Sequence, residues 1–260
     1  MAINGTKVSV IIPLYNEPKA AKNIHLIEEE LKKSFKRYEI ICVNDGSRDK
    51  TESLLNGYHS SKIKVYSYPM NIGKGFALCF GFTQSTGELV AFFDADLDIH
   101  PKHIRLYADL MDLVEADVVI GSKRHQLSRV KYPLNRKVYS FVYQKLIKLL
   151  FGLNLTDTQV GVKLFRRKVL QRVIPRLLVK QWAFDLELLV VASHLGFKRI
   201  IEAPVEIKLR SFGSKINSQA VYRTLVDTAA IFYRCHLLRF YDQKRRVRPY
   251  QAKVAQLKSE

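Results

Sequence analysis

The sequence predicts an α/β fold built on a mostly parallel sheet, and three observations support this class. Apolar runs rich in β-branched residues alternate with helical segments through the first 120 residues. Those runs are apolar almost throughout, which is typical of strands that helices cover on both faces. The chain of 260 residues is 47% hydrophobic and 26% charged, so we expect a soluble globular protein with a sizeable core.

The strands of the first half are identified by their β-branched and aromatic content, and the helices by their length and apolar spacing. Five strands are expected, at Lys7–Ile12, Tyr38–Val43, Ile63–Ser67, Leu89–Phe93 and Asp117–Ile120. Four helices of 10 to 17 residues alternate with them, at Lys19–Phe35, Asp49–Tyr58, Gly75–Gln84 and His103–Val114. Such sheets bind ligands beyond the carboxyl ends of their strands, so the residues after each strand are the first candidates for function.

The second half is richer in helices. Arg136–Phe151 is predicted as an amphipathic helix with cationic polar positions, and Phe184–Leu195 as a second helix. Strands are expected around Lys163–Phe165 and Arg199–Leu209. The first helix has an apolar face formed by Val138, Phe141, Val142, Leu146, Leu149 and Leu150. A long helix over Ser218–Tyr241 has an apolar stripe formed by Val221, Leu225, Ala229, Phe232, His236 and Phe240.

The net charge of +19 is concentrated in the second half of the chain. Residues 1–120 carry 14 Lys and Arg against 16 Asp and Glu, a balance of −2. Residues 121–260 carry the other 29 basic residues and only 8 acidic ones, a balance of +21. A basic half of this kind predicts an anionic partner, which is a nucleic acid, a phosphorylated substrate or an anionic membrane surface.

Neither a membrane-spanning segment nor a secretion signal is expected. The longest stretch without Asp, Glu, Lys or Arg is Gly75–Gly87, 13 residues, whereas a spanning helix needs about 20. The apolar run Val8–Leu14 is followed by Tyr-Asn-Glu and no cleavage site. The cysteines, Cys42, Cys79 and Cys235, lack Cys-x-x-Cys spacing, which argues against disulfides and zinc and favours a reducing cytoplasm.

Alternating carboxylates follow the fourth expected strand, at Asp94, Asp96 and Asp98. Carboxylate oxygens are the ligands that Mg²⁺ and Mn²⁺ prefer. An EF-hand loop begins in the same way, but it requires a glycine at its sixth position and a glutamate at its twelfth. Ile99 and Arg105 stand there instead. The pattern therefore predicts a site for a hard divalent cation at the end of this strand.

Two glycine-containing turns follow other strands. Val43–Ser47 reads Val-Asn-Asp-Gly-Ser, and Asn71–Gly75 reads Asn-Ile-Gly-Lys-Gly. Taken alone, each also fits an ordinary turn before a helix. Neither is a nucleotide-binding P-loop, and no Gly-x-Gly-x-x-Gly follows the first strand. A Rossmann dehydrogenase is therefore not expected.

Taken together, four segments resemble glycosyltransferase family 2 in order and spacing: Val10–Glu17, Val43–Thr51, Asn71–Gly75 and Asp94–Asp96. Within that family the chain looks most like polyprenyl-phosphate sugar synthases of the dolichol-phosphate mannose synthase type, whose later motifs resemble Asp157–Phe165 and Arg210–Lys215. The resemblance covers about residues 7–215. It implies a GT-A fold with a nucleotide-sugar-binding α/β half at 1–120 and an acceptor-binding half at 121–215. An amphipathic helix and basic tail would follow at 216–260.

The resemblance also implies roles for individual residues. It assigns the nucleotide to Pro13, Tyr15, Glu17, Asp45 and Lys74. Asp94 and Asp96 are the implied catalytic residues, Asp96 and Asp98 would hold a divalent metal (Mg²⁺ or Mn²⁺), and Arg210 and Lys215 would contact the donor diphosphate. Three departures from the family pattern leave the donor base, the sugar and the last two roles open. Asn44 stands where Asp is common, Asp98 where Gln is frequent in the mannose synthases, and the Arg210–Lys215 spacing is compressed.

The basic half suits a lipid monophosphate acceptor, which is nearly dianionic because its second pKa is about 6. Such an oxygen is already a nucleophile, so it needs no general base. It does need fixed cations that bring two anions together. The candidates for this acceptor phosphate site are Lys123, Arg124, Arg136 and Ser140.

The expected activity is inverting, metal-dependent transfer of a hexose from a nucleoside-diphosphate sugar, of the GDP-mannose or UDP-glucose type, to a polyprenyl or dolichyl phosphate. The amphipathic helices would hold the enzyme peripherally on the cytoplasmic, anionic membrane surface. A carbohydrate hydroxyl acceptor stays open, with Asp157, Asp185 or Glu187 as its base. A basic nucleic-acid-binding protein is a second alternative, although no recognised nucleic-acid motif is present and no such partner is expected.

Overall fold

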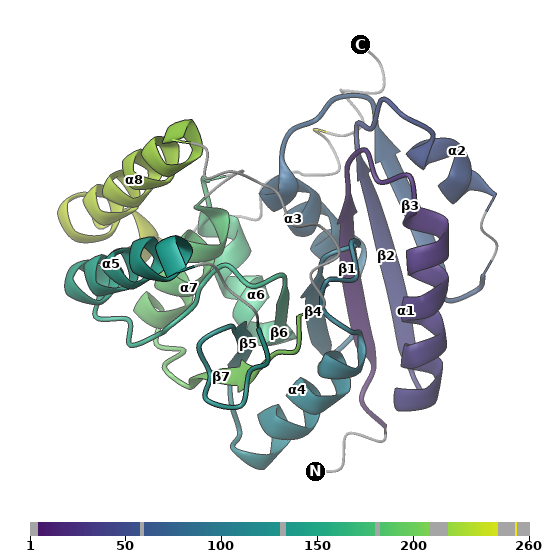
Figure 1. Cartoon of the computed structure of the whole chain (residues 1–260), viewed down its shortest axis with the longest axis horizontal. Coiled ribbons are helices and arrows are strands. Elements are labelled where there is room, and N and C mark those ends of the chain that lie inside the picture. The colour runs from purple at the N-terminus through teal and green to yellow at the C-terminus, as the bar shows by residue number, and fades with distance from the viewer. Residues whose placement is uncertain are drawn as a thin grey trace.

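The computed structural model describes residues 5–57, 60–130, 134–179, 183–207 and 218–243, together with Lys253. For residues 134–139 and 218 it describes the backbone only. A seven-stranded sheet with strand order β3-β2-β1-β4-β6-β5-β7 forms its centre (Figure 1). The strands are β1 (Val8–Leu14), β2 (Tyr38–Asp45), β3 (Ile63–Tyr68), β4 (Leu89–Phe93), β5 (Val118–Ser122), β6 (Val162–Arg166) and β7 (Ile200–Pro204). The α/β class predicted from the sequence is confirmed.

The sheet is mostly parallel, as predicted, with one exception. Strand β6 lies between β4 and β5 and runs antiparallel to both. Phe93 pairs with Val162 and Phe92 with Lys163 in this register. Because β6 is reversed, its amino end lies at the same edge of the sheet as the carboxyl ends of its neighbours. The loop that precedes β6 therefore joins the loops that follow the other strands.

Helices cover both faces of the sheet. One face packs against α1 (Ala20–Ser34), α2 (Thr51–Asn56) and α4 (Lys102–Leu113), around buried residues such as Ile24 and Tyr107. The other face packs against α3 (Lys74–Gln84), α5 (Leu134–Phe151), α6 (Arg167–Val173), α7 (Phe184–His194) and α8 (Ser218–Phe232). The strands are buried from both sides, which is why they read as continuous apolar runs. Helix α6 was not expected, because it is only seven residues long and joins β6 directly.

The last helix differs from its prediction. It ends at Phe232 instead of Tyr241 and continues as a π-helix, Tyr233–Leu237. Arg239 then adopts a left-handed conformation with φ of 47°, which separates it from a short 3-10 helix, Phe240–Asp242. A left-handed residue cannot continue a right-handed helix. This local turn is what ends the predicted long helix.

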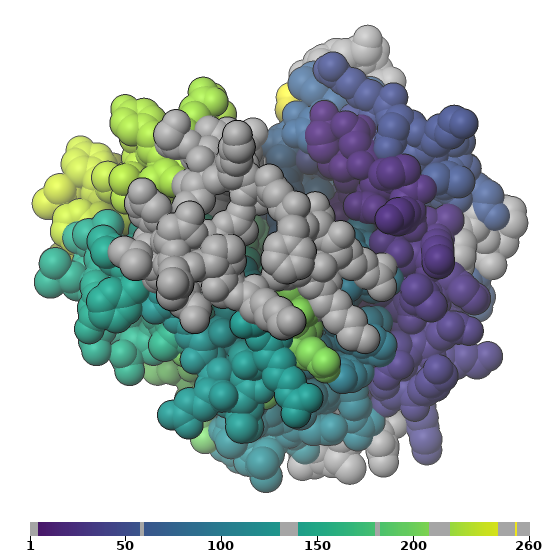
Figure 2. Space-filling model, viewed as in Figure 1, coloured from purple at the N-terminus to yellow at the C-terminus, as the bar shows by residue number. Residues whose placement is uncertain are grey.

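Helices α5 and α8 pack side by side and in the same direction. The Tyr143 and Thr228 hydroxyls are hydrogen-bonded at 2.9 Å, and about two turns further along both segments the Phe151 and His236 rings stack with centroids 6.2 Å apart. Together the two helices form the outer flank of the molecule opposite α1 and α2 (Figure 2). In the described part of the chain, no helix is long and apolar enough to cross a membrane.

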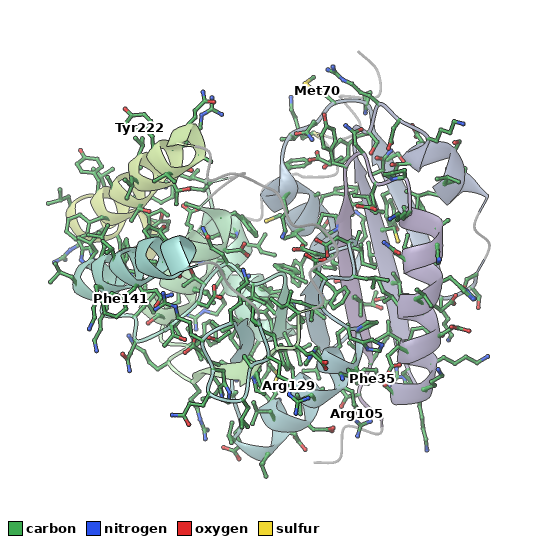
Figure 3. The ribbon with its side chains drawn as sticks, viewed as in Figure 1. Phe35, Met70, Arg105, Arg129, Phe141 and Tyr222 are labelled. Carbon is green, nitrogen blue, oxygen red and sulfur yellow. The ribbon has the colours of Figure 1, made fainter. Side chains whose placement is uncertain are left out.

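The predicted apolar stripe of α8 faces the core only at its far end, where Phe240 packs against it. The helix instead buries Thr228 and Ile231, and Cys235 is buried in the π-helix that follows, whereas Val221 and Leu225 are exposed. The prediction placed the apolar positions correctly along the sequence but did not say which side of the helix contacts α5 and α7. Tyr222 on α8 and Phe141 on α5 are exposed on this flank (Figure 3).

Candidate active site

The candidate active site lies at the edge of the sheet where the carboxyl ends of the parallel strands meet. Tyr15–Glu17 follows β1, Asp45 ends β2, Asp94–Asp98 follows β4 and Lys123 follows β5. The reversed strand β6 adds the loop that ends at Gly161, whose carbonyl accepts the Asp94 amide at 3.2 Å. The structure thus brings the predicted motifs to one edge, as expected for an open α/β sheet.

The first two motifs are joined by hydrogen bonds. The Asn16 amide donates to the Ser47 hydroxyl at 3.0 Å, and the Arg48 amide donates to the Asn16 side chain at 2.9 Å. The Glu17 amide donates to the Thr51 hydroxyl at 2.8 Å. Asn16 is left-handed, with φ of 51°, which asparagine tolerates better than most residues. Tyr15 is left 46% exposed beside Glu17 and Pro13, which are half-buried.

Asp45 holds the loop that leads into α3. Its two carboxylate oxygens accept the amides of Ile72 and Gly73 at 2.8 and 2.9 Å. Burial raises the pKa of Asp45, and these amides oppose the rise. Gly46 beside it has φ of 66° and lies so close to the Met70 backbone that a Cβ would overlap it. Asp45 therefore fixes the position of Lys74, the first residue of α3.

The carboxylate loop after β4 is fixed from two sides. The buried Asn23 side chain of α1 donates to the Ala95 carbonyl at 2.8 Å. Leu97 is left-handed, with φ of 58°, and the Asp98 amide donates to an Asp96 oxygen at 3.0 Å. The loop therefore turns back on itself and keeps Asp96 and Asp98 together.

Lys74 lies among these carboxylates. Its Nζ is 2.5 Å from an Asp94 oxygen. Desolvation favours its neutral form, but the negative charges of Asp94 and Asp185, with Asp96, outweigh desolvation and raise the pKa of Lys74. Desolvation and the charges of Asp94 and Asp98 raise the pKa of Asp96, although the Asp98 amide and Lys74 oppose them.

The donor set suits a hard cation. Repulsion between the carboxylates is relieved when a cation binds among them, and hard cations prefer oxygen ligands. The described residues contain no group of three or more His, Cys, Asp and Glu side chains placed to hold a metal alone. Mg²⁺ is typically bound by one or two carboxylates together with substrate phosphates. Asp96 and Asp98 fit such a shared site.

The predicted acceptor residues lie beyond β5 and on α5. Arg124 lies over the Phe141 ring at 5.8 Å, which brings the loop after β5 against the helix that carries Ser140. Ser140 accepts a bond from Gln144 at 3.0 Å. The backbone of Arg136 belongs to α5, but its side chain lies outside the described part of the structure.

Two predicted donor contacts, Arg210 and Lys215, lie outside the described residues. The described chain before them pairs with the carboxylate loop. Ile207 forms a bridge with Ile99, and Glu206 binds Lys102 at 3.0 Å. After β7, the chain at Glu206 and Ile207 therefore runs beside the loop that carries Asp96 and Asp98.

Of the three carboxylates considered as a general base, two are engaged elsewhere. Glu187 is fully buried, and its oxygens accept the amides of Leu178 and Val179 and the Tyr241 hydroxyl. Asp185 is paired with Lys163 at 2.9 Å. Asp157 accepts the amides of Lys123 and Gln159 at 3.3 and 3.1 Å, which places it beside the predicted acceptor residues.

Sequence reasoning missed two residues of this region. Glu202 on β7 accepts the amides of Thr156 and Asp157 at 2.8 and 2.9 Å and so shapes the loop before β6. Lys163 belongs to a motif that was identified, but no role was assigned to it. No pattern in the sequence connects Glu202 with Asp157, which lies 45 residues away.

Known proteins share both the sequence and the fold. The family profile described as Glycosyl transferase family 2 matches residues 9–174. A dolichyl-phosphate beta-glucosyltransferase of Trichomonas vaginalis is 33% identical over 91% of this chain and 77% of its own length. A dolichyl-phosphate beta-glucosyltransferase of Dictyostelium discoideum is 33% identical over 75% of this chain and 64% of its own length.

Solved structures agree on the architecture. Glucosyl-3-phosphoglycerate synthase from Mycobacterium tuberculosis, in complex with Mn²⁺, uridine diphosphate and phosphoglyceric acid, superposes with a TM-score of 0.66 at 20% identity, over 89% of this chain and 79% of that one. Mannosyl-3-phosphoglycerate synthase from Rubrobacter xylanophilus gives a TM-score of 0.65 at 17% identity, over 94% and 77%. These likenesses establish the fold.

The sheet with its reversed strand has the GT-A fold of the solved neighbours, and the family profile and the curated relatives show that the chain is a sugar-transferring enzyme. The chain belongs to glycosyltransferase family 2 and is similar to polyprenyl-phosphate sugar synthases, as its motifs predicted.

Proposed function

We propose that this enzyme transfers glucose from UDP-glucose to a dolichyl or other polyprenyl phosphate, with inversion at the anomeric carbon. The observation that carries the proposal is the 33% identity to a dolichyl-phosphate beta-glucosyltransferase over 91% of the chain. The solved neighbour that binds uridine diphosphate supports the choice of base. The glucosyl relatives favour UDP-glucose over GDP-mannose, between which the motifs do not choose.

The donor would lie along the loops after β1, β2 and β4. Pro13, Tyr15 and Glu17 would flank the nucleoside, and Asp45 would support it through the loop after β3, whose Ile72 and Gly73 amides it accepts. Lys74 would face the diphosphate, with Arg210 and Lys215 as further contacts from the segment after Ile207. Asp94 would orient the sugar beside the reacting carbon.

A divalent cation would be held by Asp96 and Asp98. The raised pKa of Asp96 favours the binding of a cation there, and the solved glucosyl-3-phosphoglycerate synthase was crystallised with Mn²⁺. The cation would be Mg²⁺ or Mn²⁺. Such a cation neutralises the charge that develops on the leaving diphosphate. The protein's own contribution is to keep the carboxylates together on a rigid loop.

The acceptor phosphate would bind at Lys123, Arg124, Arg136 and Ser140. A phosphate monoester is nearly dianionic at neutral pH and attacks without a general base. The engagement of Asp185 and Glu187 with other groups agrees with this chemistry. A hydroxyl acceptor would instead need a base, for which Asp157 is the remaining candidate.

The flank formed by α5 and α8 would lie on the cytoplasmic membrane surface, peripherally. Phe141, Val142 and Leu149 on α5 are 52%, 62% and 82% exposed, next to the exposed Lys145 and Lys148. On α8, further apolar side chains are exposed, namely Val221, Tyr222, Leu225 and Val226. Exposed apolar residues interspersed with cations are typical of helices that lie in an anionic lipid interface.

A donor-binding screen tests the first half of this proposal. Titration calorimetry with Mn²⁺ would compare UDP-glucose with GDP-mannose, and UDP with GDP. We expect the uridine compounds to bind more tightly, and to lose most of their affinity when chelator removes the metal. Tighter binding of GDP-mannose would contradict the donor assignment. Binding of single-stranded nucleic acid in preference to all four would favour the nucleic-acid alternative.

A further inference from the structure

Lys163 is a charged residue in the middle of the sheet. Its side chain is 3% exposed, and its Nζ contacts only two described groups, the Val160 carbonyl at 2.6 Å and Asp185 at 2.9 Å. Asp185, near the start of α7, is 16% exposed. Two charges removed from water in this way are costly to the fold, and an apolar pair of similar volume is often at least as stable. Their presence here calls for a functional explanation.

The pair lies next to the donor site. Lys163 on β6 pairs with Phe92 on the neighbouring strand β4, and Asp94 directly follows that strand. The bond from Lys163 to Val160 also fixes the turn before Gly161, against which the Asp94 carboxylate lies. Lys74, which binds Asp94, is also attracted by the charge of Asp185. The four side chains therefore alternate in charge: Asp94, Lys74, Asp185 and Lys163.

Because the charges alternate in this way, the carboxylates of Asp94 and Asp185 both attract the one ammonium group of Lys74. The Lys163 charge balances that of Asp185. Without it, Asp185 would be a poorly hydrated carboxylate whose charge still attracts Lys74. Lys74 would then be drawn toward α7, away from Asp94.

We propose that Lys163 is a positioning residue for Lys74: by neutralising Asp185, it leaves Lys74 at Asp94, where its ammonium faces the diphosphate of the donor. The inference rests on the proposed function for the identity of that donor.

The test compares UDP with uridine, because only UDP carries the diphosphate. Calorimetry with Mn²⁺ would be performed on the wild type, Lys163→Met, Lys163→Met/Asp185→Asn and the control Lys168→Met, whose lysine is 63% exposed on α6. We expect Lys163→Met to lower UDP affinity about tenfold and to leave uridine affinity unchanged. Adding Asp185→Asn should restore UDP affinity, because an amide does not compete for the ammonium. Lys168→Met should match the wild type.

A second background tests whether the effect passes through Lys74. In Lys74→Met, the further change Lys163→Met should not lower UDP affinity. If Lys163→Met folds poorly, Lys163→Gln removes the same charge but keeps a donor for Val160 and Asp185. Equal losses of UDP and uridine affinity, or no rescue by Asp185→Asn, would overturn the inference and leave a purely structural pair. A wild type that binds neither UDP nor GDP more tightly than the nucleosides would overturn the donor assignment itself, and this inference with it.

Discussion

The carboxylate of Asp94 lies directly against the Cα of Gly161, and the two residues are also joined by a backbone hydrogen bond of 3.2 Å. Any Cβ at position 161 would overlap the Asp94 carboxylate. Gly161 has no positive φ to explain its identity, so the close approach is the reason for a glycine here. The loop before β6 thus sets the position of a predicted catalytic side chain.

Gly161→Ala should therefore reduce turnover by about 10- to 100-fold, since misplacement of a reacting group by about 1 Å has that cost. The fold should survive, because Asp94 can rotate away from the new methyl group. Turnover and thermal unfolding are the measurements. Gly57→Ala is the matched control, since its Cβ would meet nothing closer than 3.8 Å. Wild-type turnover in Gly161→Ala would show that the position of Asp94 is unimportant.

Asp96→Ala should abolish turnover and the metal-dependent part of donor binding without unfolding the protein. Asp96 lies on a surface loop, so its removal leaves no buried cavity. Asp98→Ala should weaken metal affinity less, because Asp98 contributes to the same site but Asp96 remains. Metal-dependent calorimetry with UDP measures both effects. If Asp96→Ala kept full activity in the presence of chelator, the metal would have no part in the reaction.

Far from the site, Glu39 should make stability depend on pH. It is 3% exposed, and burial alone would raise its pKa, but bonds from Ser9, Thr86 and Lys7 outweigh burial and lower the pKa to about 2. An unfolded glutamate titrates near 4.3, so this stabilisation is present above that pH and is lost as the pH falls toward 2.

Glu39→Gln should cost about 3 kcal/mol at pH 7, from a pKa difference of about 2 units. The loss should vanish as the pH approaches 2, and donor binding should not change, because Glu39 begins the strand whose other end carries the site. Urea unfolding of the wild type and Glu39→Gln between pH 2 and 7 measures this difference in the free energy of unfolding. A loss that is the same at every pH would contradict this charge-based explanation.

The membrane proposal predicts that α5 binds anionic liposomes through its cations. Lys145→Gln/Lys148→Gln should weaken partitioning about 30-fold, since each basic residue near an anionic surface contributes about 1 kcal/mol. Lys32→Gln/Lys33→Gln on α1 is the control, with two exposed lysines on the opposite flank. Co-sedimentation at low and high salt is the measurement. Equal losses in both variants would point to charge in general and not to this flank.

The sequence predicted the strands and the carboxylate loop because their signals are local. Leu89–Phe93 is a continuous apolar run, and Asp94, Asp96 and Asp98 follow it directly. One short segment therefore predicts both where the loop lies and which ligand chemistry it offers. Each strand end then falls at the same edge of a parallel sheet. The family's motifs predicted the other residues that are proposed for the donor site.

The features that escaped prediction depend on contacts between distant residues. Strand β6 runs antiparallel to β4, with Lys163 paired to Phe92. The ion pair between Lys163 and Asp185 joins β6 to α7. Neither leaves a periodic pattern in the chain. The apolar stripe of α8 could be identified from the sequence, but an amphipathic helix has the same pattern whether its apolar side contacts a core or faces outward. Only the burial of Thr228 and Ile231 decides that question.

Transfer of radiolabel from UDP-[¹⁴C]glucose to dolichyl phosphate shows whether a lipid phosphate accepts the sugar. With Mn²⁺ or Mg²⁺ present, we expect label in a chloroform-soluble product, in greater amount than from GDP-[¹⁴C]mannose and absent with Asp96→Ala. Label that enters a water-soluble carbohydrate, with none in the lipid phase, would contradict a lipid phosphate acceptor and assign the enzyme a hydroxyl acceptor.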